Sequence, residues 1–185
     1  MLNKDYLRKK YFKIRRNNYF DVSKLFFKPI ENLLKKSSRK NKIKVSLYYP
    51  SNYEVNTLKF FELIKFKKKI ITLLPLISAN NKIKFYKWNY LDNLNVNKYG
   101  MLEPSKSKKS LIPNIVLVPL LAFDNHKHRL GYGKGYYDRF LNKYLNLNNK
   151  IITIGVAFSF QKYNKLPTSK LDVKLDYILT ENGIR

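Results

Sequence analysis

The run NIVLVPLLAF, residues 114–123, is the most hydrophobic stretch of the chain and the strongest constraint on its fold. A strand this apolar is normally covered on both faces, as the central strands of a parallel sheet are. Pro119 has no N–H to donate to a neighbouring strand, so we expect it near the carboxyl end of this strand. Two further apolar runs, residues 69–77 and 150–159, also predict buried strands.

Helical segments alternate with these strands. Apolar side chains recur at helical spacing in residues 3–17, 21–36, 54–68 and 135–146. Asp21 and Asn52 are candidate N-caps for the second and third of these helices. Shorter strands are expected over residues 44–50, 82–88 and 175–181, and residues 89–113 form a long polar excursion.

The alternation of strands and helices predicts an α/β fold. We expect a Rossmann-like three-layer sandwich, with a mostly parallel central sheet and helices on both faces. A chain of 185 residues suits one domain, and no linker divides it, so residues 1–185 are predicted to form a single domain.

The residue composition excludes several classes of site. There are no cysteines, so disulfides, thiolate nucleophiles and cysteine zinc sites are ruled out. No uncharged apolar run is long enough to span a membrane, and the first residues lack the apolar core of a signal peptide. We therefore expect a cytoplasmic protein with no membrane association.

The net charge of +26 has two interpretations. It could serve a polyanionic partner such as nucleic acid, or it could be a compositional bias toward lysine. A nucleic-acid footprint concentrates in one patch, whereas here the charge is spread along the whole sequence. The spread favours bias, so nucleic acid is not the expected partner, although the charge will attract anionic substrates.

The loop HRLGYGKGYYDRF, residues 128–140, lies between the central strand and a helix. In an open α/β sheet this order places the loop at the carboxyl edge of the strands, where ligands bind. Glycines let backbone N–H groups turn toward an anion, and the helix N-terminus adds its positive dipole end. Arg129 and Lys134 add full charges, so the loop predicts a phosphate site.

Two well-known phosphate loops do not fit this sequence. A Walker A loop needs Ser or Thr after the Gly-Lys pair, and here Gly135 is followed by tyrosine. The dinucleotide fingerprint needs a third glycine at the position of Tyr136. A glycine-rich turn without a ligand remains the structural alternative.

The segment VPLLAFDNHKHRLGYGKGYYDRFL, residues 118–141, resembles the signature of the 5-formyltetrahydrofolate cyclo-ligase family, also called 5,10-methenyltetrahydrofolate synthetases. The family pattern, a strand ending in P-x-x-x-F-D and then R-L-G-x-G-x-G-Y-Y-D, is filled at every position. Similar matches are KDYLR (4–8), YYPSNYEVNT (48–57), NKYGMLEP (97–104) and residues 154–181. Leu171 departs from the histidine that many members carry, which puts only that local contact in doubt.

The resemblance implies conversion of 5-formyltetrahydrofolate to 5,10-methenyltetrahydrofolate, with ATP as co-substrate, Mg²⁺ as cofactor, and release of ADP and phosphate. Phosphorylation of the formyl oxygen and attack by N10 need positioning and charge neutralisation more than covalent help from the protein. The expected partners are ATP and the folate, including polyglutamylated forms, with no obligatory protein partner.

The same resemblance implies the roles of individual residues. Arg129 and Lys134 are the expected catalytic residues. ATP is expected to contact Lys4, Arg8, Arg129, Leu130, Gly131, Tyr132, Gly133, Lys134, Gly135, Tyr136 and Tyr137. The folate is expected to contact Tyr49, Glu54 and Tyr136. Asp138 and Asp172 are the expected Mg²⁺ ligands.

Each of these roles has a structural alternative. Asp138 and Glu54 could be first-turn helix acids, and Asp172 could cap a turn. Lys4 and Arg8 could be solvated, and Tyr49 could simply pack. The pair His126 and His128 is too small a ligand set to predict a metal site.

Two rival functions remain open at this point. A basic nucleic-acid-binding protein would explain the charge, but neither the glycine-rich loop nor the two aspartates. A kinase-like or ligase enzyme on the same scaffold would explain the loop, with a different small substrate.

Overall fold

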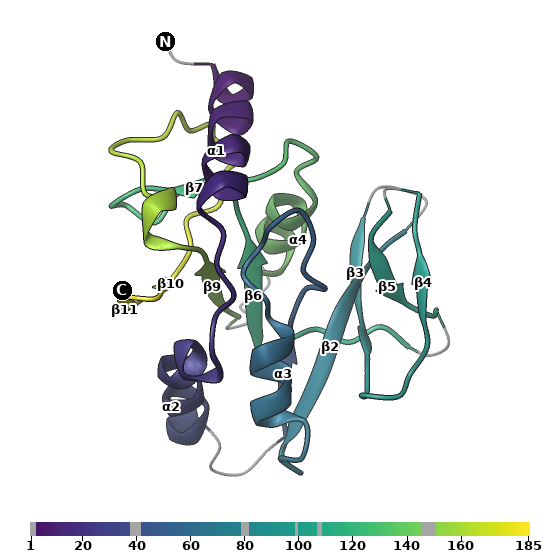
Figure 1. Cartoon of the computed structure of the whole chain (residues 1–185). Helices are drawn as coiled ribbons and strands as arrows, with labels where there is room; N and C mark the ends of the chain where they lie inside the picture. Colours follow the sequence, from purple (N-terminus) through teal and green to yellow (C-terminus); the bar gives the residue numbers. More distant parts are fainter. Residues whose placement is uncertain (1–2, 38–41, 79–81, 99, 107–108, 146–150) are drawn as a thin grey trace.

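The computed structural model describes residues 3–37, 42–78, 82–98, 100–106, 109–145 and 151–185. Its main sheet has seven strands in the order β11-β10-β9-β6-β1-β2-β3 (Figure 1). The strands are β1 (Ile43–Ser46), β2 (Ile70–Ile77), β3 (Ile83–Lys87), β6 (Ile115–Pro119), β9 (Ile152–Val156), β10 (Tyr177–Thr180) and β11 (Gly183–Ile184). The five inner strands run parallel, and the edge strands β3 and β11 are antiparallel to their neighbours.

Both faces of the sheet are buried, as the apolar runs predict. In β6, Leu117 belongs to one core cluster, while Val116 and Val118 belong to another on the opposite face. The first face is covered by α2 (Lys28–Ser37) and α3 (Leu58–Ile64), and the second by α4 (Tyr136–Leu145). This arrangement confirms the predicted α/β fold with a mostly parallel central sheet. Pro119 is the last residue of β6, as expected.

Helix α1 (Lys4–Asn18) packs on the segment that follows β6. Its residues Leu7 and Tyr11 form a small core with Leu121, Ala122 and Leu130. Asn3 caps the helix by accepting a hydrogen bond from the Asp5 N–H. Because this packing lies beyond the carboxyl end of β6, it brings the basic face of α1 toward the glycine-rich loop.

The predicted helix starts are wrong in two places. The second helix begins with a 3₁₀ turn, η1 (Lys24–Phe27), whose N-cap is Ser23, while the Asp21 carboxylate pairs with Lys59 instead. The third helix is only Leu58–Ile64 and starts after Thr57. Asn52 is not its cap, because Asn52 and Tyr53 form a turn with positive φ angles of 49° and 63°.

Other segments are also more divided than the sequence indicated. The polar excursion contains a hairpin of β4 (Leu94–Val96) and β5 (Leu102–Pro104). A second hairpin, β7 (Ala122–Phe123) and β8 (Arg129–Leu130), follows β6, and β8 contains the first residues of the glycine-rich loop. Strand β1 ends at Ser46. Strand β9 ends at Val156 and is followed by η2 (Ser159–Gln161). Edge strand β11 was not predicted.

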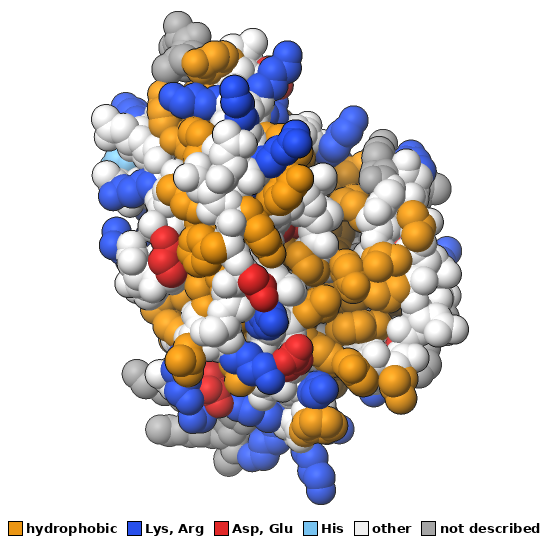
Figure 2. Space-filling view, in the orientation of Figure 1, with side chains coloured by type: hydrophobic (Ala, Val, Ile, Leu, Met, Phe, Trp, Pro, Cys, Tyr) orange, Lys and Arg blue, Asp and Glu red, His pale blue; other side chains and the backbone are white. Residues whose placement is uncertain are grey.

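On the face shown in Figure 2, lysine and arginine side chains lie in several separate places, and an apolar area lies to the right of centre. Within the described ranges, no helix has both the length and the apolar character needed to cross a membrane.

Candidate active site

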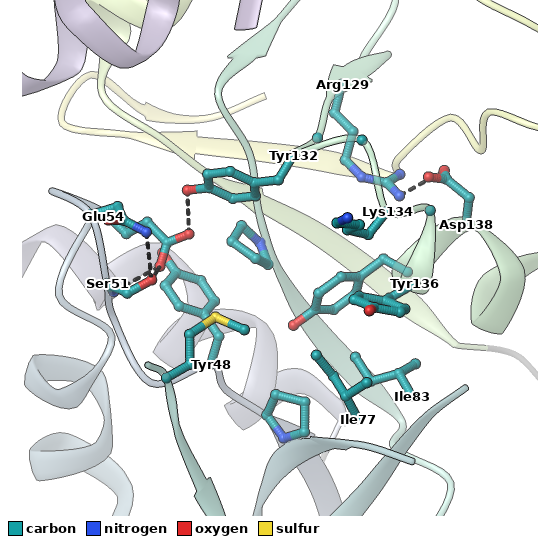
Figure 3. A pocket seen from close by; sticks show the side chains of 18 of the residues that line it. Tyr48, Ser51, Glu54, Ile77, Ile83, Arg129, Tyr132, Lys134, Tyr136 and Asp138 are labelled. Atoms are coloured by element: carbon teal, nitrogen blue, oxygen red, sulfur yellow. Dashed lines mark hydrogen bonds and ion pairs between the residues drawn. The ribbon is translucent and has the colours of Figure 1, made fainter. Parts of the chain in front are cut away.

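A cavity of about 400 Å³ lies where the chain changes direction across the sheet (Figure 3). From β1 the chain continues to β2 on one side, whereas β6 lies on the other side of β1 and leads on to β9. Such a switch point opens a crevice outside the carboxyl ends of the two strands. Tyr48 and Tyr49 after β1, and Pro119 at the end of β6, line the cavity.

The glycine-rich loop forms one wall. Gly133 and Gly135 have positive φ angles of 93° and 63°, which side-chain-bearing residues adopt only with strain. A Cβ at Gly133 would also lie 3.2 Å from the Arg8 guanidinium carbon. Arg8 Nε donates to the Gly131 carbonyl at 3.0 Å, which ties α1 to the loop. Lys134 lines the cavity and forms no ion pair with any described residue.

Both predicted metal ligands, Asp138 and Asp172, line the cavity. The segment that carries Asp172 contacts Asp138, because the N–H of the next residue, Val173, donates to Asp138 Oδ1 at 3.2 Å. Each carboxylate has a cationic partner: Arg129 Nη2 is 2.7 Å from Asp138, and Lys4 pairs with Asp172. Burial raises the pKa of Asp172, but the Lys4 ammonium and the Ser169 N–H outweigh it, so the net pKa is lowered.

The donor set at this wall fits one kind of metal ion. Among described residues, nowhere do three or more acidic or histidine side chains converge on a possible metal position. His126 and His128 lie outside the cavity lining, and His128 Nδ1 lies 3.3 Å from Asp124 instead. Two carboxylates suit Mg²⁺, which takes its remaining ligands from water and from substrate phosphates.

Glu54 lies across the cavity from the loop, in the turn with positive φ angles. It is only 7% exposed. Its Oε2 accepts a 2.9 Å hydrogen bond from the Ser51 N–H, and its Oε1 accepts one from the Tyr132 hydroxyl. Burial raises the pKa of Glu54, and these hydrogen bonds together with the nearby Arg15 charge offset part of that rise. The turn therefore presents a buried carboxylate held mainly by neutral donors.

The remaining wall is apolar. It comes from strands β2 and β3 and from the hairpin β4–β5, which packs against β2. Its side chains are Pro75, Ile77, Ile83, Met101 and Leu102. Glu103 joins this wall and accepts from the Ile77 N–H at 3.3 Å and from Asn97 Nδ2 at 3.0 Å. A cavity with an apolar wall and a few polar groups is typical of small-molecule sites.

All residues predicted for the site line this one cavity. They are Lys4, Arg8, Tyr49, Glu54, the loop from Arg129 to Tyr137, Asp138 and Asp172. The prediction missed the apolar wall, Tyr48, Ser51 and the buried Arg15. The match of NKYGMLEP to a family motif was the only signal for the β5 part of the wall. For Arg15 the signal was its position four residues after the inward-facing Tyr11.

These features define an α/β protein in which a glycine-rich loop and a buried carboxylate face one cavity, as in enzymes that bind small molecules. Comparison with known proteins identifies the family within that class. The chain belongs to the 5-formyltetrahydrofolate cyclo-ligase family, whose model matches residues 2–181. The resemblance noted in the sequence is thereby confirmed.

Individual relatives agree with the family match. The 5-formyltetrahydrofolate cyclo-ligase of Haemophilus influenzae is 30% identical over 154 residues, covering 80% of this chain and 79% of the relative. That of Mycoplasma pneumoniae is 33% identical over 138 residues, covering 74% and 72%. The NMR structure of Aquifex aeolicus 5,10-methenyltetrahydrofolate synthetase is 33% identical with a TM-score of 0.75, covering 100% of this chain and 92% of that one.

Proposed function

We propose that this enzyme converts 5-formyltetrahydrofolate to 5,10-methenyltetrahydrofolate, consuming ATP and releasing ADP and phosphate. The observation that carries the proposal is the shared cavity. A glycine-rich loop with the uncompensated Lys134 and a buried Glu54 line the same space of about 400 Å³. A nucleotide phosphate and a folate ring system can therefore meet in it.

The polar wall suits the triphosphate. Backbone N–H groups of the loop, the amino end of α4, Arg129 and Lys134 are the groups that would bind the phosphates. Lys4 and Arg8 of α1 would extend the contact along the nucleotide. Asp138 and Asp172 would hold Mg²⁺, which would neutralise phosphate charge when bound.

The Glu54 side of the cavity suits the folate. The Glu54 carboxylate can accept hydrogen bonds from the N–H groups of the pterin or from its formamide end. Tyr49 and Tyr136 line the space beside it, and the apolar wall offers a surface for the flat rings. Hydrogen bonds from the ligand would compensate the desolvation cost of the buried Glu54 carboxylate, and this would favour binding.

The chemistry requires two displacements. The formyl oxygen attacks the γ-phosphorus and ADP leaves, which gives an imidate phosphate. N10 then attacks the former formyl carbon, its proton is lost and phosphate leaves, which closes the methenyl ring. Arg129 and Lys134 would stabilise charge on the transferring phosphoryl group, so the protein acts by positioning and electrostatics.

The test is an absorbance assay with purified protein. 5-Formyltetrahydrofolate, ATP and Mg²⁺ together should produce the absorbance of methenyl-folate, with one ADP formed per folate converted. Omitting ATP, or chelating Mg²⁺, should abolish the rise. Folded protein that produces no methenyl-folate under these conditions would contradict the proposal. The cytoplasmic location, the single domain and the absence of an obligatory protein partner stay predictions.

A further inference from the structure

Tyr132 connects the two walls of the cavity that would bind different substrates. It lies between Gly131 and Gly133 in the glycine-rich loop, yet its hydroxyl reaches the Glu54 turn and donates to Glu54 Oε1 (Figure 3). Burial raises the pKa of this hydroxyl well above its usual value, so it remains a neutral donor. One hydrogen bond therefore joins the phosphate-binding loop to the folate-binding carboxylate.

Arg15 fixes the other side of the Tyr132 hydroxyl. Its Nη2 donates to that hydroxyl and to the Asn52 carbonyl, each at 2.7 Å. Its Nη1 donates to the Leu120 carbonyl at 3.1 Å. Arg15 is only 1% exposed, so a buried cation links α1, the segment after β6, the Glu54 turn and the loop. It also holds the carbonyl of the positive-φ residue Asn52.

Next to Tyr132, the loop is also held to α1 by the hydrogen bond from Arg8 Nε to the Gly131 carbonyl at 3.0 Å. Gly133 and Lys134 are exposed, and the Tyr132 residue as a whole is 39% exposed although its hydroxyl is engaged. Glycine on each side gives the backbone at Tyr132 freedom to shift. Phosphates bound by the loop would remove that freedom and, through Tyr132, fix the direction in which Glu54 faces.

We propose that Tyr132, supported by Arg15, is a positioning residue that couples nucleotide binding at the loop to folate binding at Glu54. The inference rests on the proposed function, because it needs both ligands in the one cavity. Coupling of this kind is reciprocal: each ligand tightens the other by the same factor. Without the hydroxyl, the loop and the Glu54 turn would order independently.

The experiment compares wild type with Tyr132→Phe, which keeps the ring and removes only the hydroxyl. The Kd of 5-formyltetrahydrofolate is measured by calorimetry with and without a non-hydrolysable ATP analogue and Mg²⁺. In wild type the analogue should tighten folate binding about 5-fold or more, the usual lower range of coupling between sites. In Tyr132→Phe the ratio should fall close to 1.

A merely structural role for the hydroxyl would give a different pattern. Loop damage would weaken analogue binding by the same factor with and without folate and so leave the ratio at its wild-type value, whereas loss of coupling lowers the ratio itself. Tyr90→Phe is the matched control, because Tyr90 is 62% exposed and does not line the cavity. It should keep the wild-type ratio.

A second variant tests the support from Arg15. Arg15→Lys keeps the charge but cannot make three guanidinium contacts, so it should also lower the ratio, together with the unfolding temperature. A wild-type ratio of 1, or an unchanged ratio in Tyr132→Phe, would overturn the coupling while leaving the proposed function intact. Folded wild type that binds neither ligand would overturn the proposed function itself.

Discussion

Two glutamates of this protein, the partly buried Glu31 and the buried Glu54, have opposite environments. Glu31 of α2 faces Lys67, Lys28 and Lys35, with Nζ-to-carboxylate distances of 2.6, 3.1 and 3.8 Å. Hydrogen bonds from Lys67 and Lys28 lower its pKa to about 2. Glu54 in the cavity has hydrogen bonds from a hydroxyl and a backbone N–H, and burial raises its pKa.

The difference separates a carboxylate that lysines compensate from one that burial leaves partly uncompensated in a cavity. At Glu31 three lysines compensate the charge, and one of them, Lys67, joins α2 to the segment after α3. At Glu54 the protein leaves much of the desolvation cost in place. Lys134 on the facing wall is exposed and forms no ion pair with a described residue. Perturbed and under-compensated groups in a cavity are typical of functional sites.

The largest expected effect comes from Lys134→Ala. If the glycine-rich loop binds the ATP phosphates as proposed, loss of this cation should lower kcat/KM for ATP about 100-fold to 1000-fold, as removal of one preorganised group does in other sites. The unfolding temperature should hardly change, because Lys134 forms no ion pair with a described residue.

The matched control for that change is Lys67→Ala in the α2–α3 cluster. It should lower the unfolding temperature and leave the steady-state kinetics with ATP and folate unchanged. Comparable kinetic losses in both variants would mean that the two regions do not differ in the way described above.

Glu54→Gln should have the next largest effect. The change replaces the charged acceptor proposed for the folate with a neutral amide, and hydrogen bonds to charged groups contribute about 1.5–3 kcal/mol. We expect kcat/KM for 5-formyltetrahydrofolate to fall about 10-fold to 100-fold, chiefly through KM. Glu31→Gln, the same chemical change in the other region, should keep wild-type kinetics.

Glu31→Gln should instead affect stability. Removing the carboxylate from its three lysines should cost about 1 kcal/mol, which lowers the unfolding temperature of a chain of this size by about 2–4 °C. Because the folded pKa of about 2 lies below the unfolded value, this stabilisation is present above the unfolded pKa and disappears as pH falls toward 2. Thermal unfolding near pH 7 and at progressively lower pH measures both parts.

The smallest effect is the pH dependence of stability at Glu54. Its folded pKa is raised, so its contribution is fully present below the unfolded pKa and is lost as pH rises through the folded pKa. The difference in unfolding temperature between Glu54→Gln and wild type should therefore shift in favour of the variant as pH rises. A shift in the other direction would show that Glu54 is stabilised as a carboxylate, like Glu31.

Much of the site could be predicted because its motifs are contiguous in sequence. The loop from Arg129 to Asp138 carries its own glycines, cations and helix start, so its chemistry could be recognised without knowing what packs against it. The apolar wall could not be predicted in this way, because Ile77 and Met101 come to line one cavity only after the β4–β5 hairpin folds against β2. The prediction of Asp21 as a helix cap was wrong, because Asp21 pairs with Lys59 of another helix and does not cap its own.

By itself the sequence determined the α/β class, the buried strands and the glycine-rich loop, since hydrophobic periodicity and glycine spacing act locally. Only the tertiary structure decided that Arg15, an apparently ordinary member of a basic helix, is buried and bonded to Tyr132. It also decided that Glu54 faces the glycine-rich loop. Contacts between residues so distant along the chain depend on the packing of whole elements, which no local pattern of residues encodes.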